Sequence, residues 1–321
     1  MKKFIPYLGI VFVIVLILVY PESAVFYASS SLSLCAKIIV PSLFPFFVLS
    51  SLLNRMGLPA ALGKLIAPLG ERLFGVSGAG CTALAVGLTG GYPMGAAYIA
   101  DLRRDEVITT EEAEQLLAFC NNSGSAFLIG AVGCGVFHSV RIGFLLWGVH
   151  AFAAVVTGIL LRKRAVFIPH SEFRIPNSAN DESFAKLLTA SIRQSVPAIL
   201  NVCGFVICFT VVLSLLDAYG ALSVAAGFIA QHTGAELSLV RSLLCGFVEL
   251  GSGVGEMRTL LPTPAVLSMA AFVLGWGGVS VHFQTFALFS GTDIQGRLHL
   301  TGHLLSAGIA AVTMYVLANV V

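Results

Sequence analysis

A few polar side chains interrupt long apolar blocks in this sequence of 321 residues, and their types suit binding and proton transfer. Asn121 and Asn122 are adjacent amides, and burying them is costly unless each finds partners. They are candidates for ligand contact or for a turn that stabilises a tip. Glu249 is the one carboxylate deep in an apolar block, so it is a candidate for proton coupling or a structural hydrogen bond. His282 and Gln284 are ligand candidates, although a lone membrane histidine also suits a core position.

Motifs typical of enzymes are missing from the sequence. It has no GxSxG, Walker loop or HExxH, and Gly78-Ala79-Gly80 lacks the strand and helix that flank a dinucleotide site. His299 and His303 share one helix face but have no third metal ligand at a familiar spacing, and none of the seven cysteines forms a CxxC motif. We therefore predict no enzyme activity, no cofactor and no metal site.

The composition is that of a membrane protein. Apolar residues make up 57% of the chain and charged residues 11%, whereas a soluble domain has roughly 25% charged residues. Several blocks reach the roughly 20 apolar residues that span a bilayer as a helix. The net charge is only +2 and the basic residues are scattered, so the expected partner is the lipid bilayer and not a nucleic acid. The sequence predicts an all-α polytopic protein.

The series of apolar blocks occurs twice. Pro41 and Pro197, like Asn121 and Gly277, are corresponding landmarks separated by 156 residues, and two further pairs give similar offsets. Such a constant offset is typical of an internal duplication. We divide the chain into an N-terminal transmembrane helix over 1–30, a first repeat over 31–162, a cytoplasmic polar linker over 163–186 and a second repeat over 187–321.

Basic residues predict how the repeats are oriented. Lys2-Lys3 and Arg162-Lys163-Arg164 indicate cytoplasmic positions, because Lys and Arg are enriched on that side. The first repeat then needs an odd number of crossings, so the second begins on the opposite side and the two are inverted. We predict three spanning helices and one re-entrant hairpin in each repeat, the hairpins being 115–137 and 265–290. This arrangement places Arg103 and Arg104 outside the cytoplasm.

Four breaks in the apolar blocks mark the predicted site. Non-helical backbone at membrane depth is tolerated only inside the protein or along a cavity. Hairpins entering from opposite faces would bring the breaks together, and the N-termini of the following half-helices favour an anion. The alternative is that small residues merely let helices pack closely. The candidate substrate-binding residues are Gly90, Gly91, Tyr92, Asn121, Asn122, Ser123, Ser125, Gly251, Ser252, Gly277, Ser280, His282 and Gln284.

Four motifs at these positions resemble a known family. They are Pro41-Ser42-Leu43-Phe44-Pro45-Phe46, Gly90-Gly91-Tyr92-Pro93-Met94-Gly95, Cys120-Asn121-Asn122-Ser123-Gly124-Ser125 and Gly246-Phe247-Val248-Glu249-Leu250. From about residue 31 to residue 320 the chain resembles the YlbJ (SpoVV) family of sporulation integral membrane proteins, within the nucleoside-recognition or Gate domain group. The resemblance implies a multi-pass protein of the cell membrane or the outer forespore membrane that transports dipicolinic acid.

Two classes of function follow from these observations. The first is a transporter of a small organic anion, with dipicolinate as the first candidate and a nucleoside or another small carboxylate as the alternative. The second is a membrane scaffold for sporulation, without transport. The helix breaks favour transport, because a scaffold does not need unwound helices at membrane depth. A homo-oligomer is compatible with either function.

Overall fold

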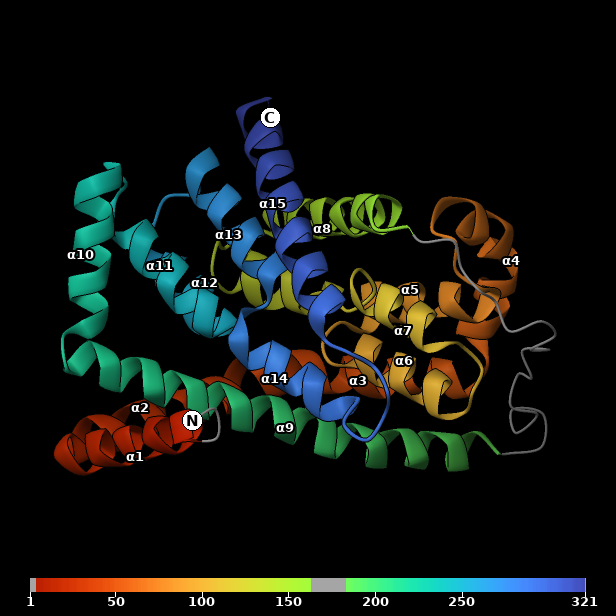
Figure 1. Ribbon diagram of the computed structural model, residues 1–321, viewed down its shortest axis with the longest axis horizontal. Helices are drawn as coiled ribbons and strands as arrows, with labels where there is room; N and C mark the ends of the chain where they lie inside the picture. The colour runs from red at the N-terminus through yellow and green to blue at the C-terminus, as the bar shows by residue number, and fades with distance from the viewer. Residues whose placement is uncertain (1–3, 163–182, 321) are drawn as a thin grey trace.

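The computed structural model describes residues 4–162 and 183–320 and is helical, which confirms the predicted all-α class (Figure 1). The first half contains α1 (Phe4–Val19), α2 (Pro21–Leu34), η1 (Cys35–Ile39), α3 (Val40–Arg55), α4 (Leu58–Leu73), α5 (Gly78–Gly90), α6 (Met94–Arg104), α7 (Thr110–Leu117), η2 (Phe127–Cys134) and α8 (Val140–Leu160). The second half contains α9 (Phe184–Ala218), α10 (Ala221–Thr233), α11 (Leu237–Val248), α12 (Leu250–Glu256), η4 (Met257–Thr259), α13 (Pro264–Trp276), α14 (Gly278–Leu288) and α15 (Arg297–Val320).

Five described helices are long and apolar enough to cross a membrane. They are Pro21–Arg55, Val140–Leu160, Phe184–Ala218, Pro264–Leu288 and Arg297–Val320. A sixth is counted if Ala67–Leu73 and Gly78–Gly90, which meet at 92°, form one broken span. The polytopic membrane architecture predicted from the composition is therefore confirmed.

The two longest of the described helices are Pro21–Arg55 and Phe184–Ala218, with 35 residues each. They pack along one another and run in opposite directions, α2 and α3 against α9 (Figure 1). The first begins before the expected boundary at residue 30, and the second begins just before residue 187. Most of the predicted linker over 163–186 lies outside the described residues.

A π-helical segment, η1, interrupts the first long helix just before Pro41. Proline has no N–H, so the carbonyl one turn earlier loses its usual partner. The hydrogen-bond ladder widens there, with the Val40 N–H donating to the Cys35 carbonyl, and the Ser42 hydroxyl donates to the Ile38 carbonyl at 2.6 Å. The long helix therefore continues through the proline.

The elements follow the same order in both halves. After each long helix come a single helix (α4 or α10), two short helices, a broken helix and a final spanning helix. Figure 1 shows α4 and α10 at opposite ends of the antiparallel long helices. This order and the antiparallel pair support the predicted inverted repeats.

The structure places the hairpins elsewhere than predicted. The helix pairs that fold back on themselves are α5–α6 (hairpin 1) and α11–α12 (hairpin 2), rather than 115–137 and 265–290. Glycines permit the close return: a Cβ on Gly253 would lie 2.1 Å from the Gly246 Cα, and one on Gly95 would lie 3.2 Å from the Gly87 Cα. Substitution at Gly253 would therefore force the two arms of hairpin 2 apart.

The segments predicted as hairpins are instead broken helices. α7 packs on α6 and α15, whereas η2, after the break at 118–126, packs on α8. In the second half α13 and α14 continue through Gly277 and Gly278, both at positive φ, within one span. Each broken helix therefore supplies a polar gap inside the protein.

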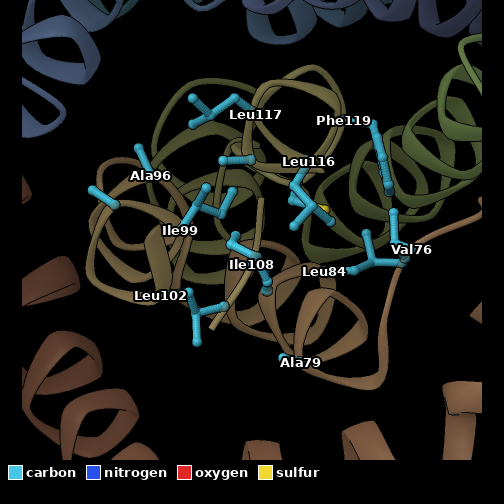
Figure 2. Close-up of a cluster of buried hydrophobic side chains, with 14 of the residues drawn as sticks. Val76, Ala79, Leu84, Ala96, Ile99, Leu102, Ile108, Leu116, Leu117 and Phe119 are labelled. Atoms are coloured by element: carbon cyan, nitrogen blue, oxygen red, sulfur yellow. The ribbon is translucent and has the colours of Figure 1, made fainter. Parts of the chain in front are cut away.

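An apolar cluster fixes hairpin 1 against α7. Side chains from α5, α6 and α7 meet there and are buried, including Leu84, Ile99 and Leu116 (Figure 2). Ile99 and Leu116 have no exposed surface. Burying such side chains contributes about 1.5–3 kcal/mol each, so this end of the molecule is a rigid support for the tip of hairpin 1.

Candidate functional site

A cavity of about 60 Å³ lies where the two hairpin tips meet the two helix breaks. A buried water needs roughly 10–15 Å³ measured in this way, so the space accommodates several waters or part of a small solute. Its lining comes from both halves of the chain and both long helices. The lining residues are Ile39, Leu43, Gly90, Tyr92, Ser123, Gly124, Phe127, Val202, Val206, Glu249, Leu250, Gly251, Ser280, Val281 and Gln284.

The tip of hairpin 2 is organised by Glu249, which ends α11 and caps α12. Its carboxylate oxygens accept the Gly251 N–H at 2.9 Å and the Ser252 N–H at 2.5 Å. The side chain is 2% exposed. A carboxylate on a helix N-terminus satisfies orphan N–H groups and the positive end of the helix dipole. Glu249 thus has the structural role that the sequence left open, while also lining the cavity.

The tip of hairpin 1 brings Tyr92 to the cavity. Gly91 has a φ of 72°, and a Cβ there would lie 2.3 Å from the Gly124 backbone nitrogen. The hairpin tip therefore touches the break between α7 and η2 through glycine on both sides. The Tyr92 hydroxyl lies 3.3 Å from Nδ1 of His303 on α15.

The first turn of α14 reaches the cavity. This helix begins at Gly278, and no side chain among the described residues caps it in the way that Glu249 caps α12. Ser280 in its first turn is 1% exposed and lines the cavity, and its hydroxyl has no hydrogen-bond partner among the described residues. Gln284, one turn further, also lines the cavity. These groups can donate hydrogen bonds to a solute.

The two asparagines, predicted to contact a ligand, bond within the protein instead. Asn121 accepts the Ala96 N–H at 3.2 Å and donates to the Thr285 hydroxyl at 2.9 Å, so it joins hairpin 1 to α14. Asn122 donates to the Phe119 carbonyl at 2.7 Å, as a tip-stabilising turn does. Neither residue lines the cavity.

Most of the remaining candidates lie around the cavity. Ser123 lines it while donating to the Leu274 carbonyl at 3.1 Å. Ser125 donates to the Thr89 carbonyl at 3.3 Å, and the Ser252 hydroxyl lies 3.1 Å from that of Thr210. Candidates that line the cavity are Gly90, Tyr92, Ser123, Glu249, Gly251, Ser280 and Gln284, while Gly91, Asn121, Asn122, Ser125, Ser252, Gly277 and His282 stand behind it.

A larger hollow of about 710 Å³, here called the vestibule, lies between α2, α9, α11 and α12 and shares Gly251 with the cavity. Arg241 on its wall is paired with Asp217 at 2.9 Å. Lys37 also lines it, is exposed, and forms no ion pair with another described residue. The vestibule lining therefore holds two cations, Lys37 and Arg241, and two carboxylates, Asp217 and Glu256, and both carboxylates contact Arg241.

Sequence reasoning missed the walls that the long helices provide. Ile39, Leu43, Val202 and Val206 face the cavity, although they belong to apolar runs that read as lipid-facing. Lys37 was the available signal, because an ionisable residue inside an apolar block marks a pathway by default. Among the described residues no group of three or more His, Cys, Asp or Glu could hold a metal ion.

The fold and the site define a class: an integral membrane protein in which two hairpins and two broken helices, one of each from either half of the chain, enclose an internal cavity. A family model described as "Gate: Nucleoside recognition" matches residues 36–160. The sporulation integral membrane protein YlbJ of Bacillus subtilis (strain 168) is 30% identical over 93% of this chain and 78% of its own length. The chain belongs to the YlbJ family of sporulation integral membrane proteins.

A solved structure supports the fold independently. A doubly substituted variant of CNTnw in an outward-facing state matches with a TM-score of 0.57, over 87% of this chain and 76% of its own. The identity is 14%, so the match shows that the arrangement of helices is shared and no more.

Proposed function

We propose that this protein carries a small organic anion across the membrane, with dipicolinate as the first candidate. The observation that supports this most is the uncapped first turn of α14, in which the buried Ser280 hydroxyl lines the cavity and has no hydrogen-bond partner among the described residues. Free N–H groups and a hydroxyl at a helix N-terminus form a binding place for a carboxylate. The CNTnw structure is described as being in an outward-facing state, which suits a fold that opens its cavity to different sides of the membrane in turn.

Glu249 does not compete with such a carboxylate. Both of its oxygens accept N–H groups of α12, so its charge is used at that helix N-terminus. The α14 terminus is a separate site on another element of the same cavity. A substrate carboxylate there would occupy the position at α14 that Glu249 occupies at α12.

The groups in the rest of the lining are of the kinds that a planar dicarboxylate would contact. Ser123 and Gly124 precede the second half of the other broken helix, so a second helix N-terminus opens onto the cavity. Apolar side chains from the long helices and Phe127 can flank an aromatic ring. Dipicolinate has a carboxylate on each side of one ring, so the proposal assigns one carboxylate to each terminus. Lys37 in the vestibule would attract it electrostatically.

A nucleoside is the second candidate, because the matching family model is described by nucleoside recognition. A nucleoside has no carboxylate, so it would rely on Gln284 and the hydroxyls rather than on helix N-termini. The two candidates therefore differ in their need for Lys37 and for the helix N-termini. A scaffold would need neither.

Thermal stabilisation of the detergent-purified protein tests the proposal. A ligand that binds only the folded state adds about 2.7 kcal/mol of stability at a hundredfold excess over Kd. The panel contains dipicolinate, other small dicarboxylates, monocarboxylates and nucleosides. We expect dipicolinate to raise the melting temperature most and to accumulate in proteoliposomes. Stabilisation by nucleosides alone would select the second candidate, and stabilisation by no solute, together with no uptake, would overturn transport.

The carboxylate position is tested by Ser280→Ala. Losing a hydrogen bond to a charged group costs about 1.5–3 kcal/mol, or roughly ten- to a hundredfold in affinity. Ser268→Ala is the matched control, since that hydroxyl donates to the Ala311 carbonyl at 2.9 Å and lies away from the cavity lining. Equal affinity for dicarboxylates in both variants would contradict the α14 site. Titration calorimetry gives the affinities.

A further inference from the structure

Three buried histidines form a cluster behind the cavity, called here the histidine cluster: His282 on α14 and His299 and His303 on α15. Their exposed fractions are 3%, 0% and 2%. His282 Nδ1 lies 3.0 Å from His299 Nε2, and the ring centroids of His299 and His303 are 4.2 Å apart. Three imidazoles at this depth are a costly arrangement unless they serve a function.

Neighbouring carbonyls assign the protons of the neutral cluster. A carbonyl can only accept, so His299 Nδ1, 3.1 Å from the Leu117 carbonyl, carries a proton. His299 Nε2 is then bare and accepts from the Nδ1–H of His282. This leaves His282 Nε2 bare and without a hydrogen-bond partner among the described residues. The cluster therefore contains a buried ring nitrogen with a free lone pair.

His303 links the cluster to the cavity. Its Nδ1 lies 3.3 Å from the Tyr92 hydroxyl and 3.3 Å from the Gly275 carbonyl. By the same rule His303 Nδ1 carries a proton, which faces both the Gly275 carbonyl and the Tyr92 oxygen, and His303 Nε2 is bare, without a hydrogen-bond partner among the described residues. Tyr92 itself lines the cavity, so this contact joins the cluster to the cavity wall.

We propose that the histidine cluster binds a proton and that its protonation is coupled to the tip of hairpin 1 through Tyr92. In the neutral state Tyr92 ties the tip to α15. When His303 Nε2 gains a proton, the Nδ1–H of the charged ring becomes a stronger donor to the Tyr92 oxygen and the Gly275 carbonyl. The proton thereby changes both the hold on the hairpin and the hydrogen bonding of the substrate site. This role rests on the proposed transport function only where it concerns uptake.

The groups that can titrate with the cluster are few. They are the three imidazoles and the Tyr92 phenol, and the described charge interactions of the rings are only with one another. α7 contributes the Leu117 carbonyl, and α13 contributes the Gly275 carbonyl and the Trp276 ring. No carboxylate is described beside the cluster, so a proton on it adds a charge that no opposite charge compensates. This charge acts on the hydrogen bond between Tyr92 and His303.

The coupling is testable without any ligand. Thr89, exposed next to the hairpin tip, is replaced by cysteine in a background without native cysteines, and its rate of reaction with a water-soluble maleimide is followed from pH 8 to pH 5. Because thiol reactivity itself varies with pH, the rates are compared as a ratio. At each pH, the labelling rate of the reporter in the protein with the unaltered cluster is divided by its rate in the variant. We expect His303→Gln and His282→Gln to lose a component of the pH dependence that the unaltered cluster shows.

Two further variants separate the Tyr92 link from general damage to the fold. Tyr92→Phe keeps all three imidazoles but removes the hydroxyl, so it should also lose this component. His150→Gln removes a buried histidine on α8 that bonds the Leu146 carbonyl at 2.8 Å outside the cluster, so it should retain it. A ratio that is constant with pH for both His303→Gln and Tyr92→Phe would overturn the coupling.

Uptake supplies a second readout. With a pH-sensitive dye inside proteoliposomes, we expect substrate entry to move protons in the wild type and His150→Gln, and this proton movement to be lost in His303→Gln. Substrate entry without proton movement in the wild type would overturn the coupling while leaving transport intact. If no solute enters at all, transport fails and the labelling result alone decides on the coupling.

Discussion

Arg103 and Asp293, 190 residues apart in sequence, form a two-pronged ion pair between the end of hairpin 1 and the loop before α15. The Nε–Oδ1 and Nη2–Oδ2 distances are 3.0 and 2.9 Å, and Thr110 donates to the same carboxylate at 2.6 Å. Arg104 donates to the Leu288 carbonyl at the end of α14. Both arginines therefore lie on the same side of the molecule as the loop that joins α14 to α15.

This pair revises the predicted orientation. With 78–104 as a hairpin and 110–134 as a broken crossing, Arg103 and Arg104 fall on the side of Arg55 and Arg162. These four arginines then share one side, as the positive-inside rule favours, while Arg141 at the start of α8 lies on the other. We predict that the end of hairpin 1 and the α14–α15 loop are cytoplasmic, whereas the α8 start and the α10 end are outside.

Single cysteines test this orientation in a background without native cysteines. Glu106→Cys and Ser290→Cys should react with an impermeant maleimide only from the cytoplasmic side. Arg141→Cys and Thr233→Cys, exposed at the other face, should react only from outside. Labelling of positions 106 and 290 from opposite sides would refute the arrangement, and would return the hairpin to 115–137.

The ion pair also predicts a pH dependence. Arg103 and Thr110 hold the pKa of the Asp293 carboxyl below its usual value of about 3.9. A carboxyl with a lowered folded-state pKa stabilises the fold fully above about pH 4, and loses that contribution as the pH falls further. We expect Asp293→Asn to lower the melting temperature at pH 6 and to reduce its fall between pH 4 and pH 3. The same acid dependence in wild type and variant would show that the pair is not responsible.

Glycine, proline and asparagine identified the breaks from sequence because each disturbs a helix locally. Which of the breaks would form hairpins could not be predicted. That choice depends on close backbone contacts such as the one between Gly246 and Gly253, and these contacts leave no periodic pattern in the sequence. Glu249 and Ser280 were found because buried polar groups stand out in apolar blocks. Val202 and Ile39 were not, because a side chain facing a cavity and one facing lipid have the same composition.

Asn121 is the clearest case of a residue whose role in the structure differs from the role predicted for it. Asn121→Ala would leave the Ala96 N–H and the Thr285 hydroxyl without their partner, at about 1–3 kcal/mol for each buried group left unsatisfied. We predict a lower melting temperature with substrate affinity nearly unchanged. Asn201→Ala, at an exposed position of α9, should alter neither. An Asn121→Ala protein with normal stability and weakened binding would reinstate direct contact with the ligand.

Lys37 should control how anions reach the cavity. It is the one vestibule cation without an ion pair among the described residues, and it lies two residues before Ile39 of the cavity wall. Focusing by a charge in a recess raises association rates by roughly tenfold or more, and salt screens the effect. We therefore expect Lys37→Gln to raise the KM for dicarboxylate uptake at low salt and to flatten its salt dependence, with little change at high salt.

Arg141→Gln is the matched control for Lys37→Gln, because it removes the same charge from an exposed position outside the vestibule. Uptake of a neutral solute by the same proteoliposomes separates charge from damage to the pathway, since a neutral molecule does not feel the ammonium field. If Lys37→Gln and Arg141→Gln have equal KM values and equal salt slopes, the vestibule does not select for charge. A neutral substrate would then be favoured over dipicolinate.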